Sequence, residues 1–265
     1  MRIALSIAGS DPTGGAGLQL DLQVFRALGV HGCGVVTALT VQDTAKVHRV
    51  LPVFPSVVSD QLRALLRDLT PHAVKLGMLA TDDVLRAVRH GLAELEAAGG
   101  PRPPVVLDPV LQASDGQPLL ERRAWNGLRE LVAECALVTP NLPEAAALTG
   151  RDVSTRSGVE LAARFLVDEL GAGAALVKGG HAEGPPDDCL AERGDGGGGV
   201  TWLAGERIEG GRVHGTGCAL AAAIAARLAR GDGLRPAVEH ARAFVARALR
   251  GAEAVGHGAR LLRLP

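Results

Sequence analysis

The stretch PVVLDPV (104–110) decides the fold class, because it is apolar almost throughout and carries a single charge, Asp108, near its end. A strand with such a continuous apolar run is typical of a parallel sheet that is covered on both faces. Similar short runs predict further strands: IALSIAG (3–9), GVVTALT (34–40), AVKLGML (73–79), CALVTPN (135–141) and AALVKGG (174–180).

Longer amphipathic stretches lie between these runs. They predict helices over 17–28, 56–69, 81–97 (with Thr81 as the N-cap), 121–133, 158–170, 218–229 and 235–252. Strands that alternate with helices favour parallel βαβ units. We therefore predict an α/β fold, a three-layer αβα sandwich with a mostly parallel central sheet, as a single domain over residues 1–265. Ligands should bind beyond the carboxyl ends of its strands.

Composition excludes several classes of partner. Charged residues make up 22% of the 265 residues and the net charge is -1, which implies no general attraction to nucleic acid or to anionic membranes. Aromatic residues are 2% and tyrosine is absent, so a base-stacking surface has little to be built from. The apolar run at the start is only about six residues, too short for a signal peptide or a membrane span. We expect a cytoplasmic protein that binds a small molecule.

The four cysteines, Cys33, Cys135, Cys189 and Cys218, are far apart in the chain and form no C-x-x-C pair. This spacing indicates reduced thiols rather than a zinc site or a disulfide framework.

The segment VHGTGCALAAAIAARLARG (213–231) is the best candidate for an anion site. Gly215, Thr216 and Gly217 precede an alanine-rich helix, and Cys218 stands at its first turn. Glycines let the backbone approach a ligand closely, and a helix N-terminus offers free N–H groups and partial positive charge. This combination suits phosphate.

The other glycine-rich segments fit phosphate less well. GSDPTGGAGLQLD (9–21) contains no G-x-G-x-x-G, and no acidic residue ends the second predicted strand, which disfavours a nicotinamide dinucleotide site. The chain also lacks GxxxxGK[ST], so HGTGC must carry the phosphates if ATP is used. No helical run follows the glycine tract 196–199, which indicates an exposed hairpin turn or a mobile loop.

Seven motifs together carry a resemblance to a known family: GSDPTGGAG (9–17), TALTVQDT (37–44), VKLGML (74–79), VVLDPV (105–110), VTPNLPEAAALTG (138–150), VKGGH (177–181) and HGTGCALAAAIAARLA (214–229). In this order they resemble the bacterial hydroxymethylpyrimidine/phosphomethylpyrimidine kinases of the ribokinase-like superfamily, from about residue 2 to residue 258. The resemblance implies a ribokinase-like fold and a homodimer. It also implies ATP-dependent phosphorylation of 4-amino-5-hydroxymethyl-2-methylpyrimidine and then of its monophosphate.

The resemblance assigns catalytic roles to the HGTGC segment. Cys218 would take the proton from the substrate hydroxyl, and a helix N-terminus is expected to lower the pKa of its thiol. Gly215, Thr216 and Gly217 would form the anion hole for the moving phosphoryl group. A cysteine in an alanine-rich helix can also be a plain packing residue.

Polar residues at the ends of the later strands are candidates for the nucleotide and the metal. In the family an Asn-x-x-Glu element, here Asn141 and Glu144, helps to organise Mg²⁺ and phosphate oxygens, and Asp108 is a second candidate for charge near the metal. Lys178 would meet the ATP phosphates as a point charge. Structural alternatives remain: a helix-starting Asn141, a solvated Glu144, a strand-ending Asp108 and a snorkelling Lys178.

On the substrate side, the resemblance places the Gln42 amide against the aminopyrimidine edge. Gly9 and Asp11 belong to the facing loop, and Met78 either contacts the ring or belongs to the core. We assign no chemistry to His181 or His214, because histidines in loops are more often hydrogen-bonding residues than catalysts.

The chain departs from the family pattern in two places. The family continues LDPV with a loop like Lys-Ser-Gly-Asp, whereas this chain reads LQASDGQPLL (111–120), with Ser114 and Asp115 where Lys and Ser are expected. A cation near a phosphate region is therefore missing. The C-terminal VGHGARLLRLP (255–265) only partly resembles the family, so closure over the pyrimidine could differ.

Two alternative functions remain open at this stage. A pyridoxal or pyridoxine kinase can share this architecture and the GTGC ending, and fold alone does not settle function. A non-catalytic sensor would not need a base such as Cys218 beside an anion hole.

Overall fold

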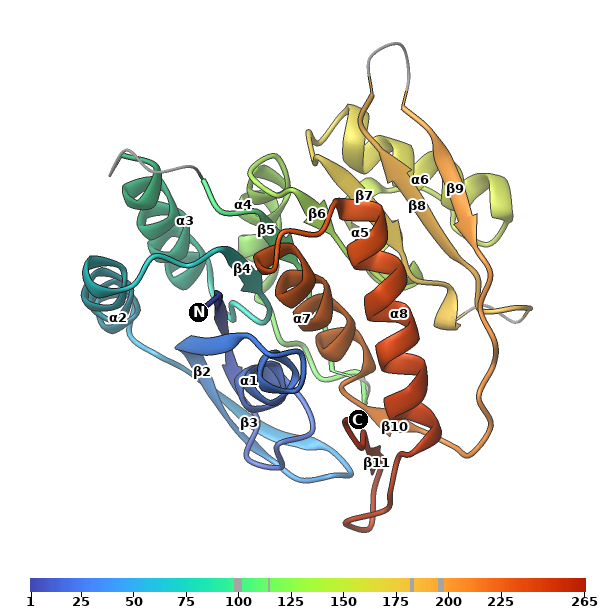
Figure 1. The fold of residues 1–265 in the computed structure, drawn as a ribbon, viewed down its shortest axis with the longest axis horizontal. Helices are drawn as coiled ribbons and strands as arrows, with labels where there is room; N and C mark the ends of the chain where they lie inside the picture. Colours follow the sequence, from blue (N-terminus) through green and yellow to red (C-terminus); the bar gives the residue numbers. More distant parts are fainter. Residues whose placement is uncertain (98–101, 114, 182–183, 195–197) are drawn as a thin grey trace.

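The computed structural model describes residues 1–97, 102–113, 115–181, 184–194 and 198–265. These residues build a nine-stranded sheet in the order β3-β2-β1-β4-β5-β6-β7-β8-β9 (Figure 1). The strands are β1 (Ile3–Ser10), β2 (His31–Gln42), β3 (Val47–Pro52), β4 (Ala73–Leu76), β5 (Val105–Leu107), β6 (Leu137–Val138), β7 (Ala174–Val177), β8 (Asp188–Glu192) and β9 (Val200–Leu203). The six strands from β2 to β7 in this order are parallel, and β3, β8 and β9 are antiparallel edges, which confirms the predicted mostly parallel sheet.

A helix overlaps every range predicted to be helical, with ends that differ by a few residues. The helices are α1 (Gly17–Ala27), α2 (Pro55–Asp68), α3 (Asp82–Ala97), α4 (Trp125–Val132), α5 (Leu142–Thr149), α6 (Arg156–Asp168), α7 (Thr216–Ala229) and α8 (Leu234–Arg250), with 3-10 turns at Arg122–Ala124 and Gly179–His181. The hydroxyl of Thr81 accepts a hydrogen bond from the Val84 N–H at 3.2 Å, as an N-cap does. Among the described helices, none is both long and apolar enough to cross a membrane.

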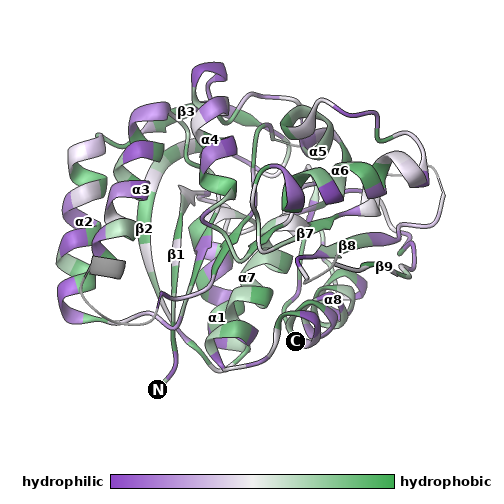
Figure 2. Ribbon diagram, turned by 90° about the horizontal axis from the view of Figure 1, so that it is seen from above, coloured by the Kyte–Doolittle hydropathy of each residue, from purple (hydrophilic) through white to green (hydrophobic). Residues whose placement is uncertain are grey.

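The helices cover both faces of the sheet. One hydrophobic cluster joins strand side chains to α2, α3, α4, α5 and α6, and a second joins the alternate strand side chains to α1, α7 and α8. Figure 2 shows these two groups of helices on opposite sides of the strands. Helix α7 is buried on almost every side, because its run of alanines lets α1, α8 and the sheet approach it closely. The predicted three-layer αβα sandwich is confirmed.

The predicted strands are too long at their carboxyl ends. The ranges for β4, β5, β6 and β7 each extend three residues beyond the observed strand. Their last three residues lie outside the strands and, apart from those after β4, are rich in polar residues, proline and glycine. These short tails contain Met78, Asp108, Asn141 and Lys178, so the ends of the strands supply much of the candidate site.

The edge strands were not predicted. Strand β3 ends in proline and is largely exposed, β8 is short and begins and ends with an acidic residue, and β9 has only four residues. None of the three therefore shows a long apolar run. The glycine tract 196–199, predicted as an exposed hairpin turn or a mobile loop, lies in sequence between the antiparallel strands β8 and β9. Gly196 and Gly197 themselves lie outside the described residues.

The order of the strands places a crevice at one edge of the sheet. From β1 the chain builds β2 and β3 on one side and then returns to build β4 on the other side of β1. Ligands bind in open α/β sheets at such a reversal, beyond the carboxyl ends of the strands. Gly9 and Met78 lie at these ends of β1 and β4.

Candidate active site

The N-terminus of α7 lacks a side-chain cap. Its N-cap, Gly215, has φ of +77°, and a Cβ at this position would overlap the carbonyl oxygen of Gly15. The residue must therefore be glycine. No side chain hydrogen-bonds to the cap, and the first N–H groups of an α-helix have no partner within the helix. The predicted anion hole at Gly215, Thr216 and Gly217 thus has the geometry that an anion requires.

Lys178 and Asp108 stand directly in front of this helix end. The ammonium of Lys178 lies 2.8 Å from Asp108 Oδ1, and the two side chains are 15% and 4% exposed. A Cβ on Gly217 would lie 3.1 Å from Lys178 Nζ and 3.7 Å from Asp108 Oδ2. The structure therefore brings a cation, a carboxylate and the open helix N-terminus to one point.

Asn141 and Glu144 form a capping box at the start of α5. Asn141 Oδ1 accepts from the Glu144 N–H at 2.9 Å, and a Glu144 carboxylate oxygen accepts from the Asn141 N–H at 2.8 Å. Both side chains thus accept hydrogen bonds from backbone N–H groups at the start of the helix. Asn141 therefore has the structural role of a helix-starting residue, which was one of its two predicted alternatives. Both residues still line the main cavity.

Glu144 is nevertheless chemically unusual. Burial raises the pKa of its carboxyl to about 7, against the opposing effect of the Lys178 ammonium and with a further raising effect from Asp108. Glu144 is only 7% exposed, which rules out the alternative of a solvated side chain. A cation placed near Asp108 and Glu144 would favour the ionised carboxylate.

Cys218 lies in the first turn of α7, partly exposed to the main cavity. The expectation that the helix end lowers the pKa of its thiol is wrong for the protein without ligands. Burial raises the pKa to about 11, while the Lys75 ammonium opposes this rise and the carboxylates of Asp108 and Asp21 add to it. Desolvation and two nearby anions outweigh the partial charge of the helix.

A cavity of about 690 Å³ opens from this point toward β1 and β2, and all predicted site residues line it. Met78 and Gly9 face each other within it, because a Cβ on Gly9 would lie 2.9 Å from the Met78 sulfur. Met78 is 8% exposed and belongs to a small hydrophobic cluster with Ala38 and Ala80. It therefore belongs to a small core cluster and also lines the cavity, and its contact with a substrate ring stays a prediction.

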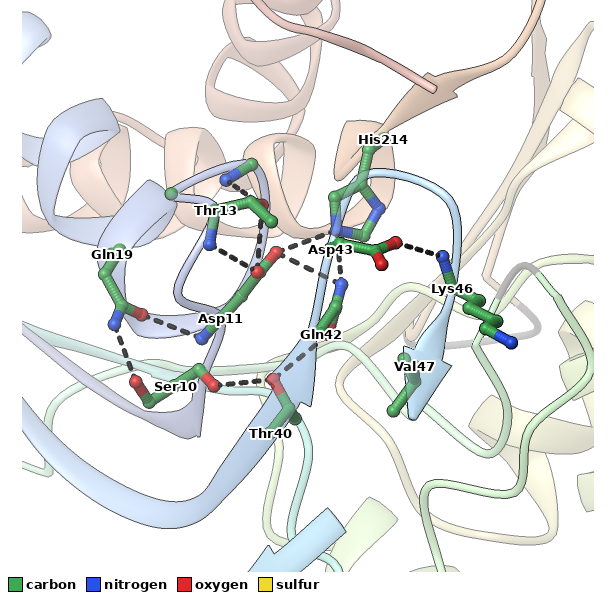
Figure 3. A network of polar contacts seen from close by, with 12 residues as sticks. Ser10, Asp11, Thr13, Gln19, Thr40, Gln42, Asp43, Lys46, Val47 and His214 are labelled. Carbon is green, nitrogen blue, oxygen red and sulfur yellow. Dashed lines mark hydrogen bonds and ion pairs between the residues drawn. The ribbon is translucent and has the colours of Figure 1, made fainter. Parts of the chain in front are cut away.

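Asp11, Gln42 and His214 form a polar network at the side of this cavity (Figure 3). His214 Nε2 lies 2.8 Å from Asp11 Oδ2 and 2.9 Å from Gln42 Nε2, and Gln42 Nε2 lies 3.3 Å from Asp11 Oδ2. Burial acts to raise the pKa of Asp11, but hydrogen bonds from His214 and Thr13 lower it overall. Sequence analysis gave His214 no role, and its contact with a residue 203 positions away has no local signal.

The network cannot satisfy all three groups at once. A His214 Nε2 that donates its proton to Asp11 cannot also accept one from the Gln42 amide. One N–H of Gln42 is therefore left without a good acceptor in this group, and Gln42 lines the cavity. This is the arrangement expected of an amide that hydrogen-bonds a ligand.

The loop that departs from the family pattern is tied to the neighbouring strand. Asp115 Oδ2 accepts from the Val47 N–H at 2.9 Å, so this loop closes one side of the cavity against β3. Ser114 lies outside the described residues. Two cations that sequence analysis did not single out, Lys46 and Arg212, also line the cavity. The loss of a lysine from 111–120 therefore does not leave this region without positive charge.

The C-terminal segment closes another side of the cavity. Strand β11 (Arg260–Leu261) pairs in parallel with β10 (Val213–His214), and the Ala259 N–H donates to the Thr44 carbonyl at 2.7 Å. Ala259 itself lines the cavity. The chain end thus holds His214 and the β2–β3 turn together.

A second cavity of about 600 Å³ lies on the other side of the α7 N-terminus. It shares Lys178, Thr216 and Gly217 with the first, and apolar side chains such as Ile208, Leu220 and Leu249 line its far part. No cluster of three His, Cys, Asp or Glu side chains that could hold a metal occurs within the described parts of the chain. Asp108 and Glu144 alone fit Mg²⁺ only as a partial site, because this ion keeps several waters and takes other ligands from phosphates.

Several known proteins to which this chain is similar are named as kinases. The family model described as phosphomethylpyrimidine kinase matches residues 11–263. The hydroxymethylpyrimidine/phosphomethylpyrimidine kinase of Rhizobium meliloti (strain 1021) is 43% identical over 252 residues, which are 95% of this chain and 91% of that protein. The crystal structure of phosphomethylpyrimidine kinase from Clostridium difficile 630 is 30% identical with a TM-score of 0.81, over 94% of this chain and 100% of that one.

An ADP complex of Bacillus subtilis pyridoxal kinase is 29% identical with a TM-score of 0.88, over 100% of this chain and 97% of that one. The fold is therefore shared with kinases that are named for two different substrates, while both the family model and the curated relatives name the pyrimidine. The predicted ribokinase-like fold and phosphotransferase class are confirmed, and this chain belongs to the phosphomethylpyrimidine kinase family.

Proposed function

We propose that this kinase transfers the γ-phosphoryl group of ATP to the hydroxymethyl oxygen of 4-amino-5-hydroxymethyl-2-methylpyrimidine, and then a second phosphoryl group to the resulting monophosphate. One observation carries this proposal: two cavities meet at the open N-terminus of α7, with Lys178 and Gly217 lining both. Phosphoryl transfer needs such a point, where two substrates meet among N–H donors and a cation.

The pyrimidine fits the cavity that contains Gln42, Met78 and Asp11. An amide with a free N–H can pair with the aminopyrimidine edge, and the Met78 thioether offers the ring an apolar contact. The nucleotide then occupies the second cavity, with its base among the apolar side chains there and its phosphates at Lys178 and the α7 N–H groups.

In the first step the hydroxyl oxygen attacks the γ-phosphorus, the bond to the β–γ bridging oxygen breaks, and ADP leaves. The hydroxyl proton passes to the sulfur of Cys218. Lys178 exchanges its contact with Asp108 for phosphate oxygens, and the N–H groups of Gly217 and Cys218 receive the developing negative charge. When bound, Mg²⁺ would neutralise phosphate charge, with Asp108 and Glu144 holding it directly or through water. In the second step the monophosphate is already anionic and requires no base.

A product assay tests this proposal. The purified protein is given Mg-ATP with hydroxymethylpyrimidine, its monophosphate or pyridoxal, each separately, and the products are resolved by mass. We expect the diphosphate from the pyrimidine monophosphate. Pyridoxal phosphate as the sole product would make the chain a vitamin B6 kinase, and no product from any of the three would indicate a sensor.

We further propose a cytoplasmic homodimer. Strand β3 is an edge of the sheet, so its outer backbone groups have no neighbouring strand among the described residues. Leu39 of β2 and Leu51 of β3 are cross-strand partners and are 50% and 40% exposed, beside the exposed Val41. An exposed edge with apolar side chains is suited to a second copy of the chain. Sedimentation of the wild type against Leu39→Glu tests this, because the variant should be monomeric.

A further inference from the structure

A second lysine–aspartate pair lies buried behind Cys218 and has no part in the mechanism above. Lys75 Nζ lies 2.8 Å from Asp21 Oδ2, and both side chains are 0% exposed. The Ser6 hydroxyl donates to the same oxygen at 2.6 Å, whereas Asp21 Oδ1 has no partner among the described residues. Burying two charges in incomplete contacts costs free energy that an apolar pair would not. Such an arrangement therefore requires a reason beyond stability.

The pair is held close to the first turn of α7. Gly17 and Asp21 lie four residues apart on α1 and so share one face of that helix. A hydrogen bond from the Gly17 N–H to the Cys218 sulfur lowers the pKa of this thiol. Helix α1 and strand β4 both pack against α7. Lys75 lines the same cavity as Cys218, although its side chain is not accessible to solvent.

The site is shaped around the Lys75 ammonium. A Cβ on Gly77 would lie 2.7 Å from Lys75 Nζ, so only a glycine leaves room for the ammonium in this position. Burial acts to lower the pKa of Lys75, but the negative charges of Asp21, Cys218 and Asp108 outweigh it and keep the group protonated. The same ammonium opposes the effect of burial on the Cys218 thiol.

We propose that Lys75, fixed by Asp21, is a positioning residue that stabilises the thiolate of Cys218 and thereby sets how readily this sulfur accepts the substrate proton. The thiol loses its proton to water before the reaction, the thiolate takes up the hydroxyl proton during the first phosphorylation, and Lys75 remains protonated throughout. The catalytic part of this inference rests on the role proposed above for Cys218, but the charge coupling does not.

The test measures the thiol directly. The rate of alkylation of Cys218 by iodoacetamide is followed against pH by peptide mass spectrometry, with Cys33 in the same sample as an internal control. Asp21→Asn is compared with the double variant Lys75→Met/Asp21→Asn, because these two proteins differ only in the ammonium and neither leaves a buried unpaired carboxylate. We expect the pH midpoint of Cys218 alkylation to be about one unit higher in the double variant.

Equal midpoints for Cys218 in the two variants would overturn the inference, as would an equal shift at Cys33. If Asp21→Asn does not fold, the double variant is compared with the wild type. Its midpoint should still be higher, because the Lys75 ammonium acts on the thiol more strongly than the Asp21 carboxylate does.

The pH profile of the first phosphorylation separates this inference from the proposed function. If Cys218 is the base, the profile shifts with the alkylation midpoint, whereas the profile of the second phosphorylation stays in place. A shifted alkylation midpoint with an unshifted first-step profile supports the Lys75 coupling and contradicts the base role of Cys218.

Discussion

Two lysine–aspartate pairs flank Cys218 with the same 2.8 Å contact but opposite surroundings. The side chains of Lys75 and Asp21 are fully buried where α1 and β4 pack against α7, whereas Lys178 borders both cavities and Asp108 borders the first. A sealed pair cannot change partners, because a charge left alone in the interior is very costly. An open pair can release its carboxylate when a phosphate arrives. The same two residue types therefore serve stability and electrostatics in one place and ligand exchange in the other.

The largest effect should follow from removing the open cation. We expect Lys178→Met to lower kcat/KM for both phosphorylations about 10³-fold, because the charge of the moving phosphoryl group is no longer neutralised. Steady-state kinetics with each pyrimidine substrate measures this. Arg63→Met is the control, since Arg63 pairs with Asp60 on the outer surface of α2, and it should behave as the wild type. Loss in only one step would mean that Lys178 contacts the substrate rather than ATP.

Removing the cation of the buried pair, Lys75 and Asp21, should mainly lower the stability of the folded protein. We expect Lys75→Met to reduce the free energy of unfolding by about 3–5 kcal/mol, because it leaves Asp21 buried without its partner. Urea unfolding compares it with Lys178→Met, whose partner Asp108 can recruit water from the cavity. Equal destabilisation by the two variants would remove the distinction between the pairs.

Two glycines, Gly217 and Gly77, each lie next to one of the two lysines. Replacing either glycine by alanine adds one methyl group beside that lysine, so the two lysine–aspartate pairs can be compared by the same change. Gly217→Ala places a Cβ 3.1 Å from Lys178 Nζ, and Gly77→Ala places one 2.7 Å from Lys75 Nζ. We expect Gly217→Ala to reduce kcat about 10–100-fold, by displacing phosphate from the helix end, with little change in melting temperature. Gly77→Ala should lower the melting temperature, because the added methyl group would push the buried Lys75 ammonium away from its contact with Asp21. The reverse pattern would contradict the assignment of the two lysines.

The smallest predicted effect concerns Glu144. Its pKa is raised to about 7 in the folded protein from an ordinary 4.5, so the folded state binds the proton more tightly than the unfolded state does. Stability conferred by the protonated form is complete below pH 4.5 and is lost as the pH rises to about 7, by on the order of 3 kcal/mol. Urea unfolding across this range should show the decline in the wild type. In Glu144→Gln, which retains the capping acceptor, the decline should be smaller; an identical decline would mean that other groups cause it.

The sequence was most informative where the structure is repetitive. Apolar runs and amphipathic stretches predicted the parallel strands and the helices because those patterns reflect burial on both faces or on one. The antiparallel edge strands were not predicted; β3, for example, is largely exposed and its residues show no strict alternation of apolar and polar side chains. The four strands were predicted too long because their apolar runs were extended over Met78, Asp108, Asn141 and Lys178, where the chain leaves the sheet to build the site.

The sequence predicted which residues line the site, but not how buried charges shift the pKa of Cys218. HGTGC identified the anion hole and Cys218 because glycines before a helix have a local signature. Lys75 offered one unused signal, a single charge in the apolar run AVKL, but its contact with Asp21 spans 54 residues. The Cys218 pKa depends on this pair and on burial, which no local pattern records, and so its predicted direction was wrong.

The pH dependence of the first phosphorylation follows from the Cys218 thiol. With a pKa of about 11 in the protein without ligands, only a small fraction is thiolate at neutral pH, and that fraction grows tenfold for each unit of pH. The rate of the first step should therefore rise between pH 6 and 9 unless bound Mg-ATP lowers the pKa, whereas the second step should change less.

The most direct test of the account is Cys218→Ala, assayed separately with hydroxymethylpyrimidine and with its monophosphate at saturating Mg-ATP. The account predicts that kcat/KM for the alcohol falls about 10²–10⁴-fold, as expected for loss of a general base, while that for the monophosphate falls less than about tenfold. Equal losses in the two steps would contradict the role of the thiol as the base that deprotonates the alcohol.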